Sequence, residues 1–143
     1  MENYAMYKAV KKELEQEKAS AENTLKAMYS KFESQVNDLR EKAASMTEEE
    51  SMSKQQELAY QQQKLSDYEN ELSQKISMNQ MKKLESVHTE IEKYIDANYS
   101  QSKYSYIIGK SSGGGVLYAK SSLNITKEVL EGLNNSYLAQ TKK

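Results

Sequence analysis

Apolar and small residues recur in steps of four, three and four along the first part of the chain. They are Val10, Leu14, Ala21, Leu25, Met28, Phe32, Val36, Leu39 and Ala43, and Glu17 occupies one position of the same stripe. This eleven-residue repeat, about 3.67 residues per turn, keeps one stripe facing a partner along a nearly straight helix. We therefore predict a helix from near Tyr4 to near Ser45, which at about 1.5 Å per residue would span on the order of 60 Å.

A second apolar stripe follows residues 48–50, which are all glutamate. Its members are Leu58, Leu65, Leu72, Ile76, Leu84, Val87, Ile91 and Ile95. The spacing is again helical. Thr47 can cap this helix, and Glu50 can complete a capping box. One narrow stripe cannot stabilise a long helix alone, so we predict that residues 1–100 form an antiparallel coiled-coil hairpin, an arm with its tip near residues 45–53.

The pattern changes after Tyr99. Residues 104–108 are aromatic and β-branched, residues 113–115 are glycines, and residues 116–119 are apolar. This order predicts a β-hairpin. Asn124 can then start a short helix that ends near residues 134–135. The predicted fold class is thus mainly α: a hairpin arm, and a small body at residues 101–143 that contains a β-hairpin and a short C-terminal helix.

Composition limits what this fold can be. The 143 residues are 37% hydrophobic and 29% charged, with a mean hydropathy of −0.91 and no proline. Long helices are therefore permitted, but the apolar material is too scarce for a thick core, so the architecture must be thin or oligomeric. No stretch approaches the roughly 18 apolar residues of a membrane span.

The charge pattern argues against a nucleic-acid partner, because the formal net charge is −1 and nucleic-acid binders normally present a basic face. The charges are unevenly spread, however. Residues 1–47 contain 8 basic and 8 acidic side chains, and residues 48–100 contain 6 basic and 11 acidic ones. Residues 101–143 contain 6 basic and 2 acidic side chains. The middle of the chain is acidic and its C-terminal part is basic.

Chemistry-bearing residues form no catalytic or metal-binding pattern. The chain has no cysteine, and its one histidine, His88, lacks a ligating partner, so we interpret it as a solvated helix residue. The glutamates at 48–50 point in different directions around a helix and cannot converge on one ion. The glycines at 113–115 precede a predicted strand, with no Lys-Ser/Thr pair as in a phosphate-binding loop. We expect a protein that is not an enzyme and needs no cofactor.

Three short C-terminal motifs carry a resemblance to a known family. They are YSYII at residues 104–108, VLYA at 116–119 and NITKEVLEGLN at 124–134. Following two long helices, they resemble the closing pattern of the Skp/OmpH family of periplasmic chaperones. Family members begin with a signal peptide and a first strand of the body sheet. This chain starts at the first helix, so we expect it to lack both segments, which would leave the two predicted strands without one neighbour.

The resemblance implies a homotrimer in the periplasm, a single OmpH-like domain in each chain, with hairpin arms that project from the body and enclose a cavity. Unfolded outer-membrane proteins would be held there without ATP and kept from aggregating. The known relatives often carry basic arms or tips. In this chain, residues 41–57 hold two lysines and five glutamates, so we do not transfer the electrostatic part of the mechanism.

Two sets of residues are candidates for binding. Methionine and tyrosine side chains beside or off the stripes can hold many unfolded segments weakly. Those we select for contact with an unfolded protein, the client, are Tyr29, Met46, Met52, Tyr60 and Tyr68. The residues that we expect in oligomerisation are Tyr104, Tyr106, Ile108, Val116 and Tyr118. The alternative for the first set is ordinary packing at the hairpin seam or between arms.

A second function class stays open, a structural coiled-coil spacer or adaptor that binds one folded partner. The polar, glutamine-rich second helix is compatible with it. The three C-terminal motifs favour the chaperone.

Overall fold

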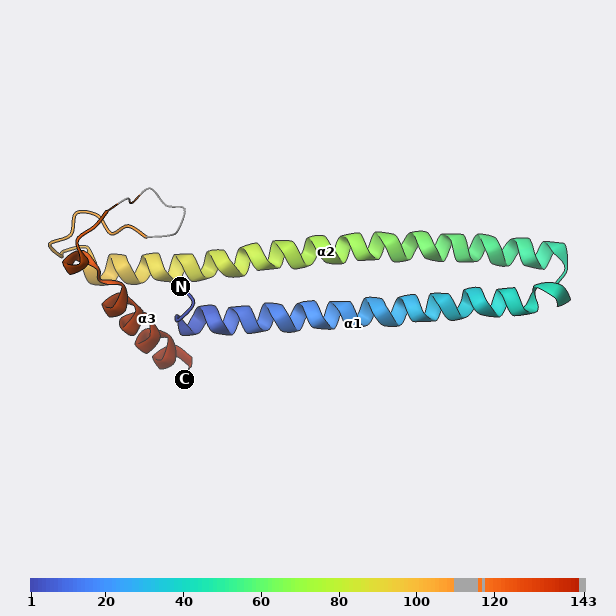
Figure 1. The fold of residues 1–143 in the computed structure, drawn as a ribbon, viewed down its shortest axis with the longest axis horizontal. Coiled ribbons are helices and arrows are strands. Elements are labelled where there is room, and N and C mark those ends of the chain that lie inside the picture. The colour runs from blue at the N-terminus through green and yellow to red at the C-terminus, as the bar shows by residue number, and fades with distance from the viewer. Residues whose placement is uncertain (110–115, 117, 142–143) are drawn as a thin grey trace. The chain divides into compact units, whose positions relative to one another are not determined.

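The computed structural model describes residues 1–109, 116 and 118–141 (Figure 1). Helix α1 spans Ala5–Lys42 and α2 spans Glu48–Tyr99, and the one-turn 3-10 helix η1, Ala43–Ser45, precedes the turn between them. A second 3-10 helix, η2 at Ser121–Leu123, precedes α3 at Thr126–Thr141. Contacts divide the chain into two compact units, residues 12–81 and residues 1–11 with 82–143.

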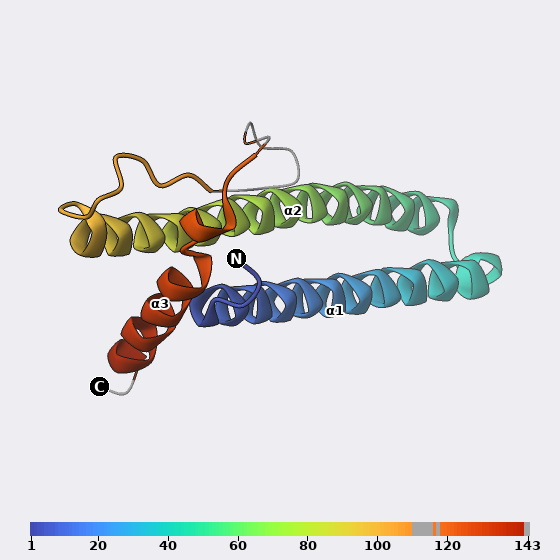
Figure 2. The same cartoon turned by 60° about the vertical axis from the view of Figure 1, so that its left-hand side comes forward.

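Residues 12–81 form an antiparallel pair of helices, with α1 and α2 side by side in both views (Figures 1 and 2). Ala21 and Leu65 are buried in this unit. The other stripe positions that are partly buried here are Leu14, Leu25, Phe32, Val36, Leu39, Leu58, Leu72 and Ile76. The two periodic stripes therefore face each other, which confirms the predicted helical arm. Few side chains are fully buried because each helix offers a single stripe.

Two polar contacts fix the register of the pair. The Asn79 side chain donates a hydrogen bond to Glu17 Oε2 at 2.5 Å, and the Tyr29 hydroxyl donates one to Glu69 Oε2 at 2.6 Å. Glu17 interrupts the apolar stripe of α1 and is partly buried. A buried carboxylate without a partner is costly. The Asn79 amide supplies that partner, which explains how the stripe tolerates a charge.

The start of α2 is a capping box. The Thr47 N–H donates to Glu50 Oε2 at 2.9 Å, and the Glu50 N–H donates to Thr47 Oγ1 at 3.2 Å. These reciprocal bonds satisfy two backbone donors that the helix leaves free. The bond from the Thr47 backbone lowers the pKa of Glu50 below its usual 4.5. The predicted capping box, formed by Thr47 and Glu50 at the start of the second helix, is confirmed.

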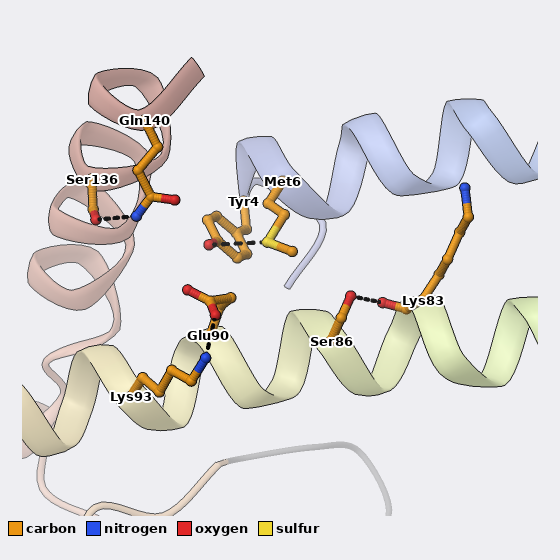
Figure 3. A network of polar contacts seen from close by, with 8 residues as sticks. All are labelled: Tyr4, Met6, Lys83, Ser86, Glu90, Lys93, Ser136 and Gln140. Carbon is orange, nitrogen blue, oxygen red and sulfur yellow. Dashed lines mark hydrogen bonds and ion pairs between the residues drawn. The ribbon is translucent and has the colours of Figure 1, made fainter. Parts of the chain in front are cut away.

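The second unit joins the start of α1, the last part of α2 and α3 (Figure 2). Its buried side chains are Tyr4, Val10, Val87 and Leu133. The rings of Tyr4 and Tyr137 meet edge to face, with centroids 6.4 Å apart. Figure 3 shows Tyr4 among α1, α2 and α3, with its hydroxyl directed to the Met6 sulfur. Burial, followed by the Glu90 charge, raises the pKa of Tyr4.

Helix α3 is longer than the sequence indicated. We expected it to end near residues 134–135, but it continues to Thr141. Asn134 would favour a helix end by its local preference, but its side chain is occupied by Ala5 and Asn3 at the start of α1. Tyr137, one turn later, packs against Tyr4. These tertiary contacts outweigh the local preference for a turn. The start of α3 agrees better with the prediction, because Asn124 Oδ1 accepts a hydrogen bond from the Thr126 N–H at 3.0 Å.

The predicted β-hairpin of the body is wrong for the residues that the structure describes. Residues 104–108, 116, 118 and 119 form no strand. Residue 117 and the glycines 113–115 lie outside the described residues. The physical reason is that β-propensity reflects packing on a pleated surface, and an isolated pair of short strands is marginal in water. In the described part of the chain, no other segment pairs with these residues or covers them as a sheet would require.

Candidate functional site

Four of the five predicted client-contact residues are exposed. The exposed fractions of Met52 and Tyr60 are 60% and 62%, and those of Tyr29 and Tyr68 are 40% and 38%. Met46, in the turn before α2, is partly buried. The five therefore lie off the seam or at its end.

The structure does not gather these residues on one face. Successive residues of an α-helix are rotated by about 100°, so positions eight apart differ by about 80°. Met52, Tyr60 and Tyr68 stand eight apart on α2, so Met52 and Tyr68 differ by about 160° and lie on nearly opposite sides of the helix. Tyr29, on α1, is tied at the flank of the pair by its bond to Glu69. A single contact surface cannot include all five.

Met78 and Met81, which we did not select from the sequence, are more exposed than most of the selected residues. Their exposed fractions are 58% and 69%. A positional signal could have found them, because Met78 lies two residues after the stripe residue Ile76. Two residues along a helix are a rotation of about 200°, which points the side chain away from the seam. Residue type identifies the methionines as candidates, and their position on the helix separates those that face the seam from those that face away from it.

Polar partners restrain the tyrosines of this unit differently. The hydrogen bond to Glu69 raises the pKa of Tyr29 and holds its hydroxyl. Tyr60 has its ring 4.8 Å from Lys64 Nζ, and a hydrogen bond with the Tyr60 side chain raises the pKa of Lys64. Both contacts are at the surface, where solvent screens such pairs and they contribute little to stability. Tyr60 therefore presents an exposed ring that a neighbouring cation holds only weakly.

Three of the five predicted oligomerisation residues are among the most exposed apolar residues in the described chain. The exposed fractions of Tyr106, Ile108 and Tyr118 are 85%, 68% and 82%. Tyr104 and Val116 are partly buried, and Lys103 Nζ lies 5.4 Å from the Tyr104 ring. Large apolar side chains exposed close together in sequence are typical of an interaction surface.

Catalytic and metal chemistry find no support in the described residues. No group of three or more His, Asp or Glu side chains in that part of the chain could hold a metal ion. His88 is exposed on α2. Across the described segments, no helix combines the length and the apolar character needed to cross a membrane.

Two long paired helices with a capped turn define the class of helical-hairpin proteins. Comparison with known families narrows this class, because the chain matches the family described as outer membrane protein (OmpH-like) over residues 1–133. The chain belongs to this family. The match covers the hairpin and the C-terminal segment, so it confirms the Skp/OmpH resemblance. The comparison with curated proteins gave no match.

Membership carries a coarse functional meaning. The OmpH-like family is one of periplasmic chaperones that are not enzymes, and its members bind outer-membrane proteins. The family therefore points to a chaperone in the periplasm. We propose below how this chain holds its clients, how it assembles and which residues make the contacts.

Proposed function

We propose that this protein is an ATP-independent holdase that binds unfolded outer-membrane proteins in the periplasm and prevents their aggregation. The observation that carries the proposal is the OmpH-like match over residues 1–133, because it includes both long helices and the first half of α3. In this proposal, three chains assemble through the body, residues 101–143, and their arms, residues 1–100, enclose the client.

The exposed tyrosines support assembly through the body. Tyr106, Ile108 and Tyr118 expose apolar surface that a single chain does not cover in the described structure. Burial of such surface stabilises by roughly 25 cal/mol per Å². An interface between copies of the chain would cover this apolar surface. A homotrimer would thus explain why Tyr106, Ile108 and Tyr118 are apolar and yet exposed in one chain.

The arm supports weak, adaptable binding of clients. Its seam buries few residues, and several methionine and tyrosine side chains are left exposed on α2. Methionine is flexible and polarizable, and tyrosine combines an apolar ring with a polar tip. Such side chains can contact many different unfolded segments without requiring one sequence.

A spacer or adaptor that binds one folded partner is the second candidate function. The observation in its favour is the density of local charge pairing on the arm, such as Lys42 with Asp38 and Lys54 with Glu57. Pairs of this kind support exposed helices that need no client. An adaptor would bind its folded partner and leave unfolded proteins unprotected.

The two functions separate in an aggregation assay without nucleotide. An unfolded β-barrel outer-membrane protein is diluted from denaturant, and light scattering is followed with and without the chaperone at a substoichiometric amount of trimer. The holdase is expected to suppress scattering in proportion to its amount, whereas an inert helical protein of similar length does not. Undiminished scattering at excess chaperone would reject the holdase and favour the adaptor.

A further inference from the structure

The exposed apolar side chains of residues 12–81 are concentrated on α2. Within this unit, the large apolar side chains that are more than half exposed are Met52, Tyr60, Met78 and Met81. All four belong to Glu48–Tyr99. The corresponding part of α1 has Met28 and Tyr29 at 37% and 40%, and Tyr29 is tied to Glu69. The two helices of the pair therefore present different surfaces.

These four residues lie on one side of α2. Tyr60 and Met78 are separated by 18 positions, which is five full turns at 3.6 residues per turn, so they lie in line along the helix axis. Met81 is rotated from Met78 by about 60°, and Met52 from Tyr60 by about 80°, in the same direction. The buried Leu65 belongs to the seam and is rotated from Tyr60 by about 140°. Met52, Tyr60, Met78 and Met81, which we call the anchors, therefore face away from α1.

The side of α2 that holds the anchors is almost free of charge. Between residues 52 and 81, the side chains in this sector are Met52, Gln56, Ala59, Tyr60, Gln63, Asp67, Asn70, Gln74, Ser77, Met78 and Met81, and all are exposed. We call them the α2 outer face. Its single charge, on Asp67, accepts a hydrogen bond from Gln63 Nε2 at 2.9 Å. The adjacent strip carries Glu57, Lys64, Glu71 and Lys75, which is how a solvated helix face ordinarily looks.

We propose that the α2 outer face is where an extended, unfolded client segment binds. The proposal rests on the holdase function and names the surface that performs it. A folded helix is a poor occupant, because a third coiled-coil helix needs apolar residues about every 3.5 positions. Between Tyr60 and Met78, about 27 Å apart along the axis, this face offers only Gln63, Asp67, Asn70, Gln74 and Ser77.

The amides between the anchors suit an extended chain. Gln56, Asn70 and Gln74 are exposed and make no side-chain hydrogen bond within the described structure. An amide side chain offers two N–H donors and two acceptor lone pairs. An unfolded segment carries one backbone N–H and one C=O at every residue except proline, and these groups need partners when water is displaced. Amides can pair with them whatever the client's sequence, while Met52, Tyr60, Met78 and Met81 contact its apolar side chains.

The outward side of α1 is a matched control that the same chain provides. Its side chains include Gln16, Asn23, Ala27 and Ser34, which are likewise uncharged and exposed. A shallow, open depression lies there, lined by small residues such as Ala19 and Ala27. This side lacks apolar anchors more than half exposed. Like the α2 outer face, this side carries little charge, with Lys31 as the charged residue that lines the depression, and it differs in the feature that we propose to bind clients.

Photo-crosslinking maps the contact directly in the full chain. A photoreactive amino acid is placed at Gln56 or Gln74 in the α2 outer face, and at Gln16 or Asn23 on α1 as controls. Each protein is mixed with an unfolded β-barrel protein and irradiated, with the helical circular dichroism signal checked beforehand. We expect several-fold higher crosslinking yields from α2. Equal yields from both helices, or higher yields from α1, would overturn the proposal.

A substitution experiment tests whether the anchors supply the affinity. The variant Met52→Gln, Tyr60→Gln, Met78→Gln and Met81→Gln keeps good helix formers and removes the exposed apolar surface. Client affinity is expected to fall at least about tenfold, the equivalent of about 1.4 kcal/mol. A control with Ala19→Gln and Ala27→Gln should stay within about twofold, a change of less than 0.5 kcal/mol.

The outcomes distinguish the surface from the function. If the unaltered chain suppresses aggregation and the four-glutamine variant does so equally well, the α2 outer face is not the binding surface and the holdase function stands. If the unaltered chain fails to suppress aggregation, the holdase function is rejected, and the proposal built on it is rejected with it.

Discussion

Asn134 caps the first turn of α1 from a position 129 residues away. Its Oδ1 accepts a hydrogen bond from the Ala5 N–H at 2.7 Å, and its Nδ2 donates one to the Asn3 carbonyl oxygen at 3.4 Å. The first N–H groups of a helix have no partner within the helix. A side chain of α3 thus does what a local cap residue does elsewhere, and joins the start of α1 to α3.

Asn134→Ala should lower the free energy of unfolding by about 1 kcal/mol, which is the typical contribution of a capping side chain. Chemical denaturation followed by circular dichroism measures the effect. Asn135→Ala is the control, because the exposed Asn135 side chain makes no hydrogen bond in the described structure. Equal losses in both variants would mean that helix propensity, and not the cap, accounts for the change.

The seam of residues 12–81 gives a second stability prediction. Leu25 is partly buried on the stripe of α1 and Lys31 is exposed. Leu25→Asp should destabilise the chain by more than about 2 kcal/mol, because it places an unpaired charge against apolar side chains. Lys31→Asp should change stability by less than about 0.5 kcal/mol. Similar urea midpoints for the two variants would show that the stripe is not the packing face.

The helical pair was predictable because its signal is local and repeated. The stripes place Leu25 and Leu65 at the seam, and Thr47 with Glu50 defines the start of α2 within four residues of sequence. Asn134 and Ala5 could not be paired from the sequence, because neither carries a periodic or charge signal for the other. The same holds for Gly132, where the Tyr94 ring lies so close that a Cβ would overlap it.

The body was mispredicted because β-propensity describes a residue's fit to neighbours. Residues 104–108 are aromatic and β-branched, and Tyr106 is 85% exposed in the described structure. The candidate contact residues show a related limit. Residue type identified Met52 and Tyr60 as unusual surface residues, but whether they share a face depends on their rotation about α2. That rotation becomes meaningful once the side facing α1 is known.

Tyr99 predicts how α3 responds to alkaline pH. Its hydroxyl donates to Glu128 Oε1 at 2.9 Å, and desolvation by burial, followed by this bond, raises the pKa of Tyr99 from 10.0 to about 12. The folded pKa is higher than the unfolded one. The stabilising effect is therefore complete below pH 10.0 and is lost as pH rises from 10.0 to about 12.

Tyr99→Phe removes this ionisation, so its stability should fall less steeply than that of the unaltered chain across the same pH window. Urea midpoints measured through the window give the difference between the two proteins. Tyr106→Phe is the control, because the Tyr106 side chain is 85% exposed. Parallel pH dependence of the Tyr99→Phe variant and the unaltered chain would show that the Glu128 contact does not form in solution.

Oxidation should act on the α2 outer face through its methionines. Met52, Met78 and Met81 are exposed, whereas Met46 is partly buried. Hydrogen peroxide transfers one oxygen atom to the thioether, giving methionine sulfoxide and water, which makes the side chain polar. The three exposed methionines should be oxidised faster than Met46, and client affinity should fall as they react. Peptide mass mapping alongside a binding assay checks both.

Replacing Met52, Met78 and Met81 with leucine provides the control, because leucine keeps the apolar surface and is not oxidised by peroxide. This variant should bind clients before and after treatment. If peroxide weakens its binding as much as that of the unaltered chain, oxidation acts at another position. Methionine sulfoxide reductases should restore the unaltered chain, since they reverse this modification.

Salt should affect client binding only modestly. The α2 outer face has Asp67 as its single charge, and the charge count of residues 48–100 is acidic, with 6 basic and 11 acidic side chains. Apolar contacts are insensitive to moderate salt, whereas exposed charge pairs are screened over about 10 Å at 0.1 M ionic strength. The dissociation constant for an unfolded β-barrel protein should therefore change less than about threefold, under 1 kcal/mol, between low and physiological ionic strength.

Replacing Met46, Met52, Tyr60 and Tyr68 together with serine should weaken binding more than this change in salt does, provided that the helical signal is retained. Met52 and Tyr60 should account for most of the loss, because they alone of the four belong to the α2 outer face. Glu33→Gln, which removes one exposed charge on α1, is the control and should leave both the affinity and its salt dependence unchanged. Strong salt dependence, with no effect of the four substitutions, would instead place client binding on cations such as Lys103, Lys120 and Lys127 in the basic C-terminal part.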